Sequence, residues 1–250
     1  MKILFFTALI AIMALSTQAA EPNIIPGTKW RVHDSKRPQP KHVQGTCQRT
    51  PAPEDAIVLF DGKNLDSFTN KKWKLKKDIM VVSKGKQKTK ESFGDCQVHL
   101  EFMFPKAICK NNRSGNSGLF FMSRYEIQIL NGWKTRTYAD GSIGAIYGQT
   151  PALVNACAKP DEWNSYDIVF TAPRFDKQGK LLSPARITAF LNGILVQNNT
   201  VILGATRFAV VPKYKAHPAR LPLYLQDHGS PVEFRNFWLR DLEKKIEAVK

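Results

Sequence analysis

Short runs in which apolar and polar residues alternate are the feature that most constrains this chain. In residues 95–104, every even position from Cys96 to Phe104 is apolar, whereas the odd positions include Asp95, His99 and Glu101. Because alternate side chains share one face of a strand, this pattern predicts a strand with one buried face. Shorter runs predict further strands at residues 125–130, 164–171, 186–191, 194–197, 221–228 and 232–240.

Turn residues separate these runs, and a helical period is nearly absent before Asp241. The dipeptide Asn192-Gly193 lies between two predicted strands. It favours a two-residue hairpin, because both central positions of a type I′ turn need a positive φ. Many short strands joined by turns predict an all-β fold, an antiparallel β-sandwich of the jelly-roll type that occupies residues 56–242.

The ends of the chain differ from this domain. Residues Ile3–Leu15 follow Lys2 and are almost wholly apolar, but the run is too short to span a bilayer. With the small residues of Thr17-Gln18-Ala19 it predicts a signal peptide at residues 1–20, and hence a periplasmic or secreted protein. The alternative is a retained N-terminal anchor. No later stretch resembles a transmembrane anchor. Residues 21–55, rich in Pro, Lys, Arg and Gln, predict an extended N-terminal arm, and residues 243–250 a short tail.

The formal net charge of +16 favours anionic surroundings such as acidic polysaccharide or the cell envelope. Nine lysines between Lys71 and Lys90 flank the apolar residues 79–82, which predicts a solvated hairpin with basic edges. No nucleic-acid partner is expected, because export argues against one and no recognition-helix or RNA-binding signature accompanies the charge.

The four cysteines, Cys47, Cys96, Cys109 and Cys157, would enter an oxidising compartment after export. One or two disulfides are therefore expected, with all three full pairings open. Their spacing is not that of a zinc or redox motif.

Two pairs of polar residues lie on predicted strands at a spacing of two: Glu126 with Gln128, and Gln226 with His228. This spacing puts both members of a pair on one face. Amide, imidazole and carboxyl groups together suit a ligand that is rich in hydroxyl groups. The pair Trp163-Asn164 adds a candidate aromatic platform for the same kind of ligand.

Eight short blocks carry a resemblance to a known family. They are residues 59–68 (LFDGKNLDSF), 116–120 (NSGLF), 125–130 (YEIQIL), 144–148 (GAIYG), 162–164 (EWN), 191–193 (LNG), 225–229 (LQDHG) and 234–236 (FRN). In this order the blocks resemble the 3-keto-disaccharide hydrolase domain family, which is also described as 3-keto-glucoside lyase and 2-hydroxy-glucal hydratase. The resemblance covers residues 57–242 and implies a sandwich similar to the concanavalin and laminin-G folds. Two positions depart from the family pattern: Asn131 replaces a usual Asp, and Phe68 a usual Trp.

The resemblance implies a glycoside or oligosaccharide substrate whose ring carbon three a separate glucoside 3-dehydrogenase has already oxidised to a ketone. The ketone acidifies the hydrogen on carbon two, so a base removes it, the aglycone leaves carbon one, and water adds to the resulting glucal. His228 is the expected catalytic base, because its ordinary pKa lies near neutrality. Glu126 is the expected second acid or base, or a ligand for a divalent cation; the metal requirement stays open.

The remaining site residues are expected to bind the substrate. Amides at Gln128 and Gln226 would hold hydroxyl groups or the ketone, and Arg235 would neutralise the enediolate. The residues Tyr147 and Trp163 would stack on the sugar ring beside Asn164. His99 and Glu101 are reserve candidates, for which a solvated edge is expected.

Direct hydrolysis ranks lower than elimination. Ordinary glycosidases need two carboxyl groups about 5–10 Å apart, and laminarinase-type sandwiches place them on one strand as Glu-x-Asp-x-x-Glu, a run that this sequence lacks. No nucleophile elbow, phosphate loop or His-Glu-x-x-His motif occurs either. Two rivals stay open: a non-catalytic glycan-binding module, which Asn131 favours, and an envelope-associated structural protein.

Overall fold

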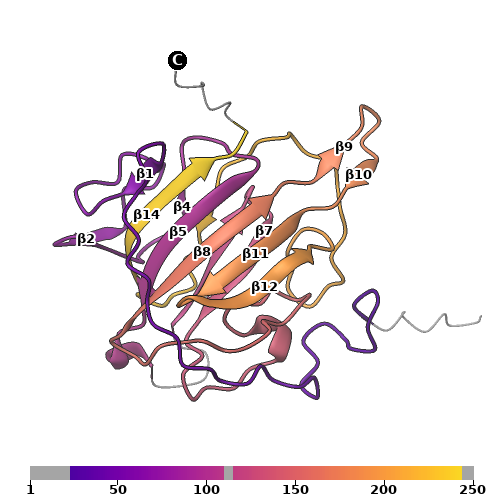
Figure 1. Cartoon of the computed structure of the whole chain (residues 1–250), viewed down its shortest axis with the longest axis horizontal. Helices are drawn as coiled ribbons and strands as arrows, with labels where there is room; N and C mark the ends of the chain where they lie inside the picture. Colours follow the sequence, from indigo (N-terminus) through magenta and orange to yellow (C-terminus); the bar gives the residue numbers. More distant parts are fainter. Residues whose placement is uncertain (1–22, 110–114, 244–250) are drawn as a thin grey trace, which may run out of the picture.

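A computed structural model describes residues 23–109 and 115–243 of the chain. The expected signal peptide and all but the first residue of the predicted tail lie outside the described residues. Within them, no helix is long and apolar enough to cross a membrane. Two antiparallel sheets form two layers, so the predicted β-sandwich is confirmed; Figure 1 shows the larger sheet in front of β4 and β7.

The larger sheet has eight strands, all antiparallel. Their order is β12-β11-β8-β5-β14-β3-β2, with β1 paired to β14. The bounds are β1 Ile57–Phe60, β2 Lys74–Lys76, β3 Ile79–Val81, β5 Cys96–Met103, β8 Trp163–Thr171, β11 Arg186–Leu191, β12 Ile194–Val201 and β14 Glu233–Asp241.

The smaller sheet has four strands in the order β4-β13-β6-β7. The bounds are β4 Gln87–Lys88, β6 Asn116–Phe121, β7 Tyr125–Leu130 and β13 Tyr224–Leu225. A separate ribbon pairs β9 Arg174–Phe175 with β10 Leu181–Ser183, and two short 3₁₀ helices are η1 Lys106–Ile108 and η2 Ala139–Gly141.

The core lies between the two sheets, and the alternating pattern decides which side chains enter it. In β5 the even positions Cys96, Val98, Leu100 and Phe102 are all fully buried in the hydrophobic core. The smaller sheet contributes Leu119, Phe121, Ile127 and Ile129 from its opposite side. The odd positions of β5 and the even positions of β7 therefore face outward from the sandwich.

The predicted hairpin at Asn192-Gly193 is confirmed, because φ is 53° at Asn192 and 77° at Gly193, and β11 and β12 flank the turn. The Asn192 side chain is buried and fixes the turn to its surroundings. Its amide nitrogen donates to Ala156 O (2.8 Å) and to Asn164 Oδ1 (2.9 Å), while its oxygen accepts from the backbone of Ser165 (2.8 Å).

The N-terminal arm is extended and is hydrogen-bonded to the larger sheet and to the loops between β7 and β8. Near its start, Ile25 and Val32 are buried. A parallel bridge joins His42 to Asn155, and further on Thr50 O accepts hydrogen bonds from the Asn236 amide (2.9 Å) and the Trp238 indole (3.1 Å). Figure 1 shows the indigo segment passing along one end of the sheets before it reaches β1.

The four cysteines do not form the disulfides that an exported protein led us to expect. All four are free thiols, with Cys96 and Cys157 in the hydrophobic core. Burial raises the pKa of the Cys157 thiol to about 12, so this group is a packing residue.

Candidate functional site

The outward face of the smaller sheet brings polar residues from three strands into rows. Register pairs Glu126 of β7 with Phe120 of β6, and Phe120 with Tyr224 of β13. In the next row Gln128 pairs with Gly118, and the backbone N–H of Gln226 donates to Gly118 O (2.9 Å). The two pairs that the sequence singled out therefore start from β7 and β13, which lie on either side of β6 in one sheet.

Glu126 is the most unusual group on this face. Only 5% of the residue is exposed, and no described residue donates a hydrogen bond to its carboxyl group. Burial alone raises the pKa of this carboxyl from 4.5 to about 8. The carboxyl group lies over Gly118, where a Cβ atom would come within 2.3 Å of Glu126 Oε1. A glycine on β6 thus provides the space for this carboxyl group.

A loop after β7 covers the carboxyl group. The backbone N–H of Tyr147 donates to Glu126 O (3.2 Å), and the hydroxyl groups of Tyr147 and Tyr138 are 3.4 Å apart. Gln128 lies beneath the same loop, where its amide nitrogen donates to Gly141 O (3.2 Å). The other amide atom, Oε1, is buried with no partner among the described residues, so it is a free acceptor inside the site.

The N-terminal arm adds an imidazole to this cluster. The ring of His33 stacks on Tyr138 at 3.9 Å and meets Tyr147 edge-on at 5.1 Å. Its backbone N–H donates to Asp140 Oδ2 (2.9 Å), a carboxyl group that is fully buried. Burial lowers the pKa of His33 and raises the pKa of Asp140, so both groups are driven toward their neutral forms.

A cavity of about 490 Å³ opens beside this cluster. Stacked rings of Phe120 and Tyr224, with centroids 4.2 Å apart, form part of its wall. Thr206 joins the cavity to the carboxyl residue, because its hydroxyl oxygen accepts the backbone N–H of Glu126 (3.1 Å). The volume falls within the range of about 300–1,000 Å³ that small-molecule sites occupy.

His228 lies in the segment that follows β13. It follows Gln226 by two residues and is exposed, and the neighbouring Asp227 is fixed by accepting N–H groups of Gly85 (2.8 Å) and Gly229 (2.9 Å). Gln226 is half-buried. The structure thus places Glu126, Gln128 and Tyr147 together. Gln226 and His228 lie after the end of β13, which β6 separates from β7.

Three expected substrate-binding residues lie elsewhere. Trp163 and Arg235 are on the outward face of the larger sheet, where the guanidinium group stacks 3.9 Å from the indole centroid. Arg235 Nε also donates to Glu101 (2.6 Å). Asn164 is fully buried, and its side-chain oxygen accepts N–H groups of Ala158 and Asn192. These residues stabilise the larger sheet and the turn beside it, and they do not reach the site on the smaller sheet.

The expectation of a solvated edge for His99 and Glu101 was wrong. Both residues are fully buried, since the arm crosses this face of β5. The His99 Nδ1 atom lies 2.7 Å from Asp167 Oδ1. Burial would raise the pKa of Glu101, but the nearby His99 ring and the hydrogen bonds from Asn236 and Arg235 outweigh it and lower the pKa to about 2.

The sequence matches the 3-keto-alpha-glucoside-1,2-lyase-like domain over residues 55–240. This match covers well over half of the chain. The protein belongs to the 3-keto-alpha-glucoside-1,2-lyase-like family. No curated protein matches the chain significantly.

Solved structures agree with this membership. A structure named as a putative glycosyl hydrolase from Parabacteroides distasonis is 41% identical, with a TM-score of 0.74, and the match covers 77% of this chain and 86% of that one. A second P. distasonis structure of the same name is 18% identical, with a TM-score of 0.54 and coverage of 76% and 95%. The second likeness concerns the fold alone.

The two departures from the family pattern have different consequences. Phe68 is fully buried and stacks on Phe237 at 6.2 Å, so the position that the family fills with Trp belongs to the core here. Asn131 accepts the backbone N–H of Trp133 (3.2 Å) through its side-chain oxygen. An Asp could accept the same bond, so this departure removes a charge and preserves the turn.

Several site residues of this family member escaped the sequence analysis. Tyr138, Asp140 and Tyr224 carry no motif of their own, and His33 lies in a segment without periodicity. These residues are recognised only in the structure, where the arm, the loop after β7 and β13 bring them close to Glu126 and Gln128. Among the described residues, no group of three His, Cys, Asp or Glu side chains is arranged to hold a metal ion. The donor set therefore does not fit the divalent cation that was considered.

Proposed function

We propose that this protein is a carbohydrate-active enzyme that cleaves 3-keto-glycosides by elimination followed by hydration. The observation that carries the proposal is the buried carboxyl group of Glu126, whose pKa of about 8 keeps it protonated at neutral pH. The backbone N–H of the same residue donates to Thr206, which lines the cavity. Such a carboxyl group can act as a general acid that protonates the oxygen of the leaving group. The family membership supports the substrate class.

The chemistry needs one proton removed and one supplied. A base takes the hydrogen from carbon two, the electron pair moves to the ketone oxygen, and the enediolate then expels the aglycone from carbon one. Glu126 gives its proton to the departing oxygen, so the aglycone leaves as a neutral alcohol. Water then adds across the resulting double bond and regenerates the free 3-keto sugar.

His228 is the base in this scheme, because its exposure lets a substrate reach the imidazole. The register places Glu126 in one row with Phe120 and Tyr224, and His228 follows Tyr224 by four residues. The free Oε1 of Gln128 would accept a sugar hydroxyl, Tyr147 would stack on the ring, and Gln226 would lie between the two catalytic groups.

The decisive experiment offers a 3-keto-glucoside to the mature protein and follows ultraviolet absorbance of the enone intermediate together with aglycone release. We expect turnover in the native protein, and a loss of about 100-fold or more in Glu126→Gln and in His228→Ala. Glu54→Gln is the matched control, because Glu54 is exposed and its side chain makes no hydrogen bond or ion pair with the described residues. Native turnover that Glu126→Gln leaves intact would refute the assignment.

The rival function is a non-catalytic glycan-binding module. The stacked rings of Phe120 and Tyr224 favour it, because aromatic rings in a cavity wall bind sugars without chemistry. Binding of the keto-glycoside without any turnover would establish this module in place of the enzyme. The enzyme also requires a partner, a glucoside 3-dehydrogenase that supplies the ketone, and the proposed setting for both is the periplasm or the secreted space.

A further inference from the structure

The cavity beside Glu126 is strongly basic. Its lining includes four cationic side chains, Arg124, Arg207, Lys213 and Lys215, and no acidic residue. A fifth cation borders it, since Lys86 Nζ lies 4.9 Å above the Tyr224 ring. Like charges gathered in one concavity repel each other, and low-dielectric walls concentrate their potential.

These cations lack the carboxylate partners that four other arginines have. Arg174, Arg220, Arg235 and Arg240 each form an ion pair with a carboxylate. In contrast, the described residues provide no carboxylate within 4.0 Å, and no hydrogen-bond acceptor, for any of the four lining cations. The Nε atom of Arg124 is even buried without a partner. An orphaned guanidinium N–H in a cavity wall is suited to an anionic oxygen.

The neighbouring acid does not neutralise the cavity, because burial keeps the Glu126 carboxyl group protonated at neutral pH. The reaction itself does not account for four cations either. An enediolate carries a single negative charge, which one cation is enough to balance. The excess of positive charge points to a second negative group that arrives with the substrate.

We infer that the natural substrate is an acidic glycoside whose carboxylate or sulfate group binds in this cavity, on the cations around Arg124. This inference rests on the proposed function, since it names the substrate class of the same site. It also assigns a role to part of the net positive charge, which steers an anionic ligand to the cavity entrance.

Equilibrium binding with three unoxidised probes tests the inference without turnover. The probes are phenyl β-D-glucopyranoside, which is neutral, phenyl β-D-glucuronide, with the carboxylate on the sugar, and 4-carboxyphenyl β-D-glucopyranoside, with the carboxylate on the aglycone. By titration calorimetry at low salt, we expect one of the acidic probes to bind at least tenfold more tightly than the neutral probe. The preference should shrink as ionic strength rises. The acidic probe that binds more tightly shows on which side of the glycosidic bond the natural substrate carries its charge.

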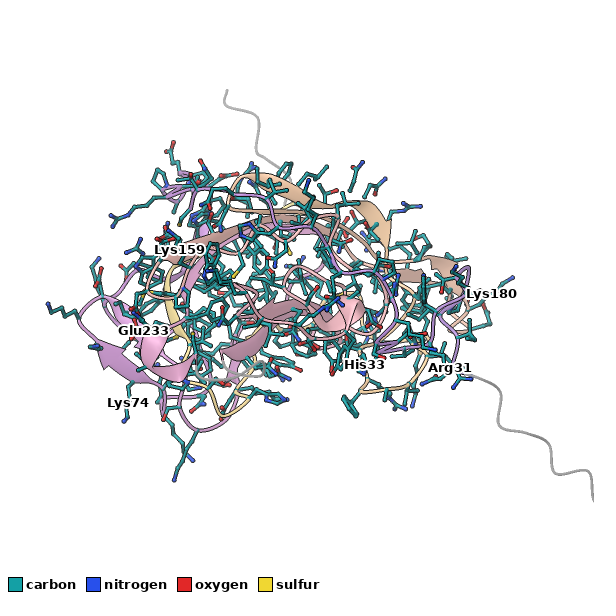
Figure 2. All side chains as sticks on the ribbon, turned by 90° about the horizontal axis from the view of Figure 1, so that it is seen from below. Arg31, His33, Lys74, Lys159, Lys180 and Glu233 are labelled. Atoms are coloured by element: carbon teal, nitrogen blue, oxygen red, sulfur yellow. The ribbon has the colours of Figure 1, made fainter. Side chains whose placement is uncertain are left out.

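Two substitutions with the same charge change separate this cavity from the general surface. We expect Lys213→Gln to reduce the preference for the acidic probe about threefold to fivefold, whereas Lys74→Gln leaves it unchanged. The ring of His33 is 5.2 Å from that of Phe208, in the loop that lines the cavity. Figure 2 shows Lys74 of β2 at the opposite end of the molecule from His33, and therefore far from the cavity. Equal affinity for all probes, or equal effects of both substitutions, would overturn the inference.

The two proposals can fail separately. Turnover of a neutral 3-keto-glucoside, combined with no preference for either acidic probe, would leave the enzyme standing and refute the acidic substrate. A clear acidic preference without turnover of any keto-glycoside would refute the elimination chemistry and preserve the anion site.

Discussion

Replacing Glu126 by Gln is expected to change the pH dependence of stability. In the folded protein the carboxyl group holds its proton up to a pKa of about 8, whereas the unfolded chain releases it near 4.5. Between these values the folded state binds more protons, so the free energy of unfolding falls as pH rises. The shift corresponds to about 5 kcal/mol across the whole window, as an upper value, since one pKa unit is about 1.4 kcal/mol. Glutamine has a similar shape but does not titrate, so the unfolding free energy of Glu126→Gln should not fall with pH for this reason.

Urea unfolding of both proteins at pH 4, 7 and 9 measures the effect. We expect the unfolding free energy of Glu126→Gln to rise relative to that of the native protein as pH increases. The difference between the two should change by several kcal/mol between pH 4 and 9. Glu54→Gln, which alters an exposed carboxyl group, provides the flat control. If the difference between native protein and Glu126→Gln is constant over this range, the carboxyl group is solvated, and the argument for a neutral proton donor fails.

Three further substitutions test other parts of the structure. Gly118→Ala places a Cβ atom 2.3 Å from Glu126 Oε1, so turnover should fall about 100-fold while thermal melting shows a loss of about 1–3 kcal/mol; normal turnover would contradict the packing. Glu101→Gln removes the charge that Arg235 contacts at 2.6 Å and should cost about 3 kcal/mol at pH 7. The native contribution of Glu101 is present above pH 4.5 and is lost as pH falls through about 2, so the variant should be less sensitive to acid in urea titrations. Asn192→Gly keeps the positive φ but loses three side-chain hydrogen bonds, and chemical denaturation should show a cost of about 2–4 kcal/mol, with an unchanged midpoint refuting the role of the side chain.

The strands could be predicted from the sequence where the alternation is long. The predicted strand at residues 186–191 coincides with β11, and the one at residues 95–104 with β5. The run 221–228 yielded only the two residues of β13, because Asp227 uses its side chain to fix a turn, and Pro222 lacks the N–H that a sheet requires. Local pattern decides strand character, whereas neighbouring segments decide strand length.

The candidate site was only partly predictable for the same reason. A spacing of two correctly put Glu126 and Gln128 on one face, but it could not tell which sheet Arg235 and Trp163 would join. Nor could it reveal that the arm covers Glu101 or supplies His33. The contact of Thr50 with Asn236 joins residues 186 positions apart, and that of His33 with Asp140 joins residues 107 positions apart, so neither contact leaves a trace in a short window.

The N-terminal arm determines how far a fragment of this family member can be shortened. The family match begins at residue 55, whereas the ring that covers Tyr138 and Asp140 belongs to residue 33. A fragment that begins at residue 55 would retain every described strand but would lose His33, whose ring stacks on Tyr138 in the candidate site. The smallest fragment that keeps the whole candidate site is therefore longer than the matched family domain.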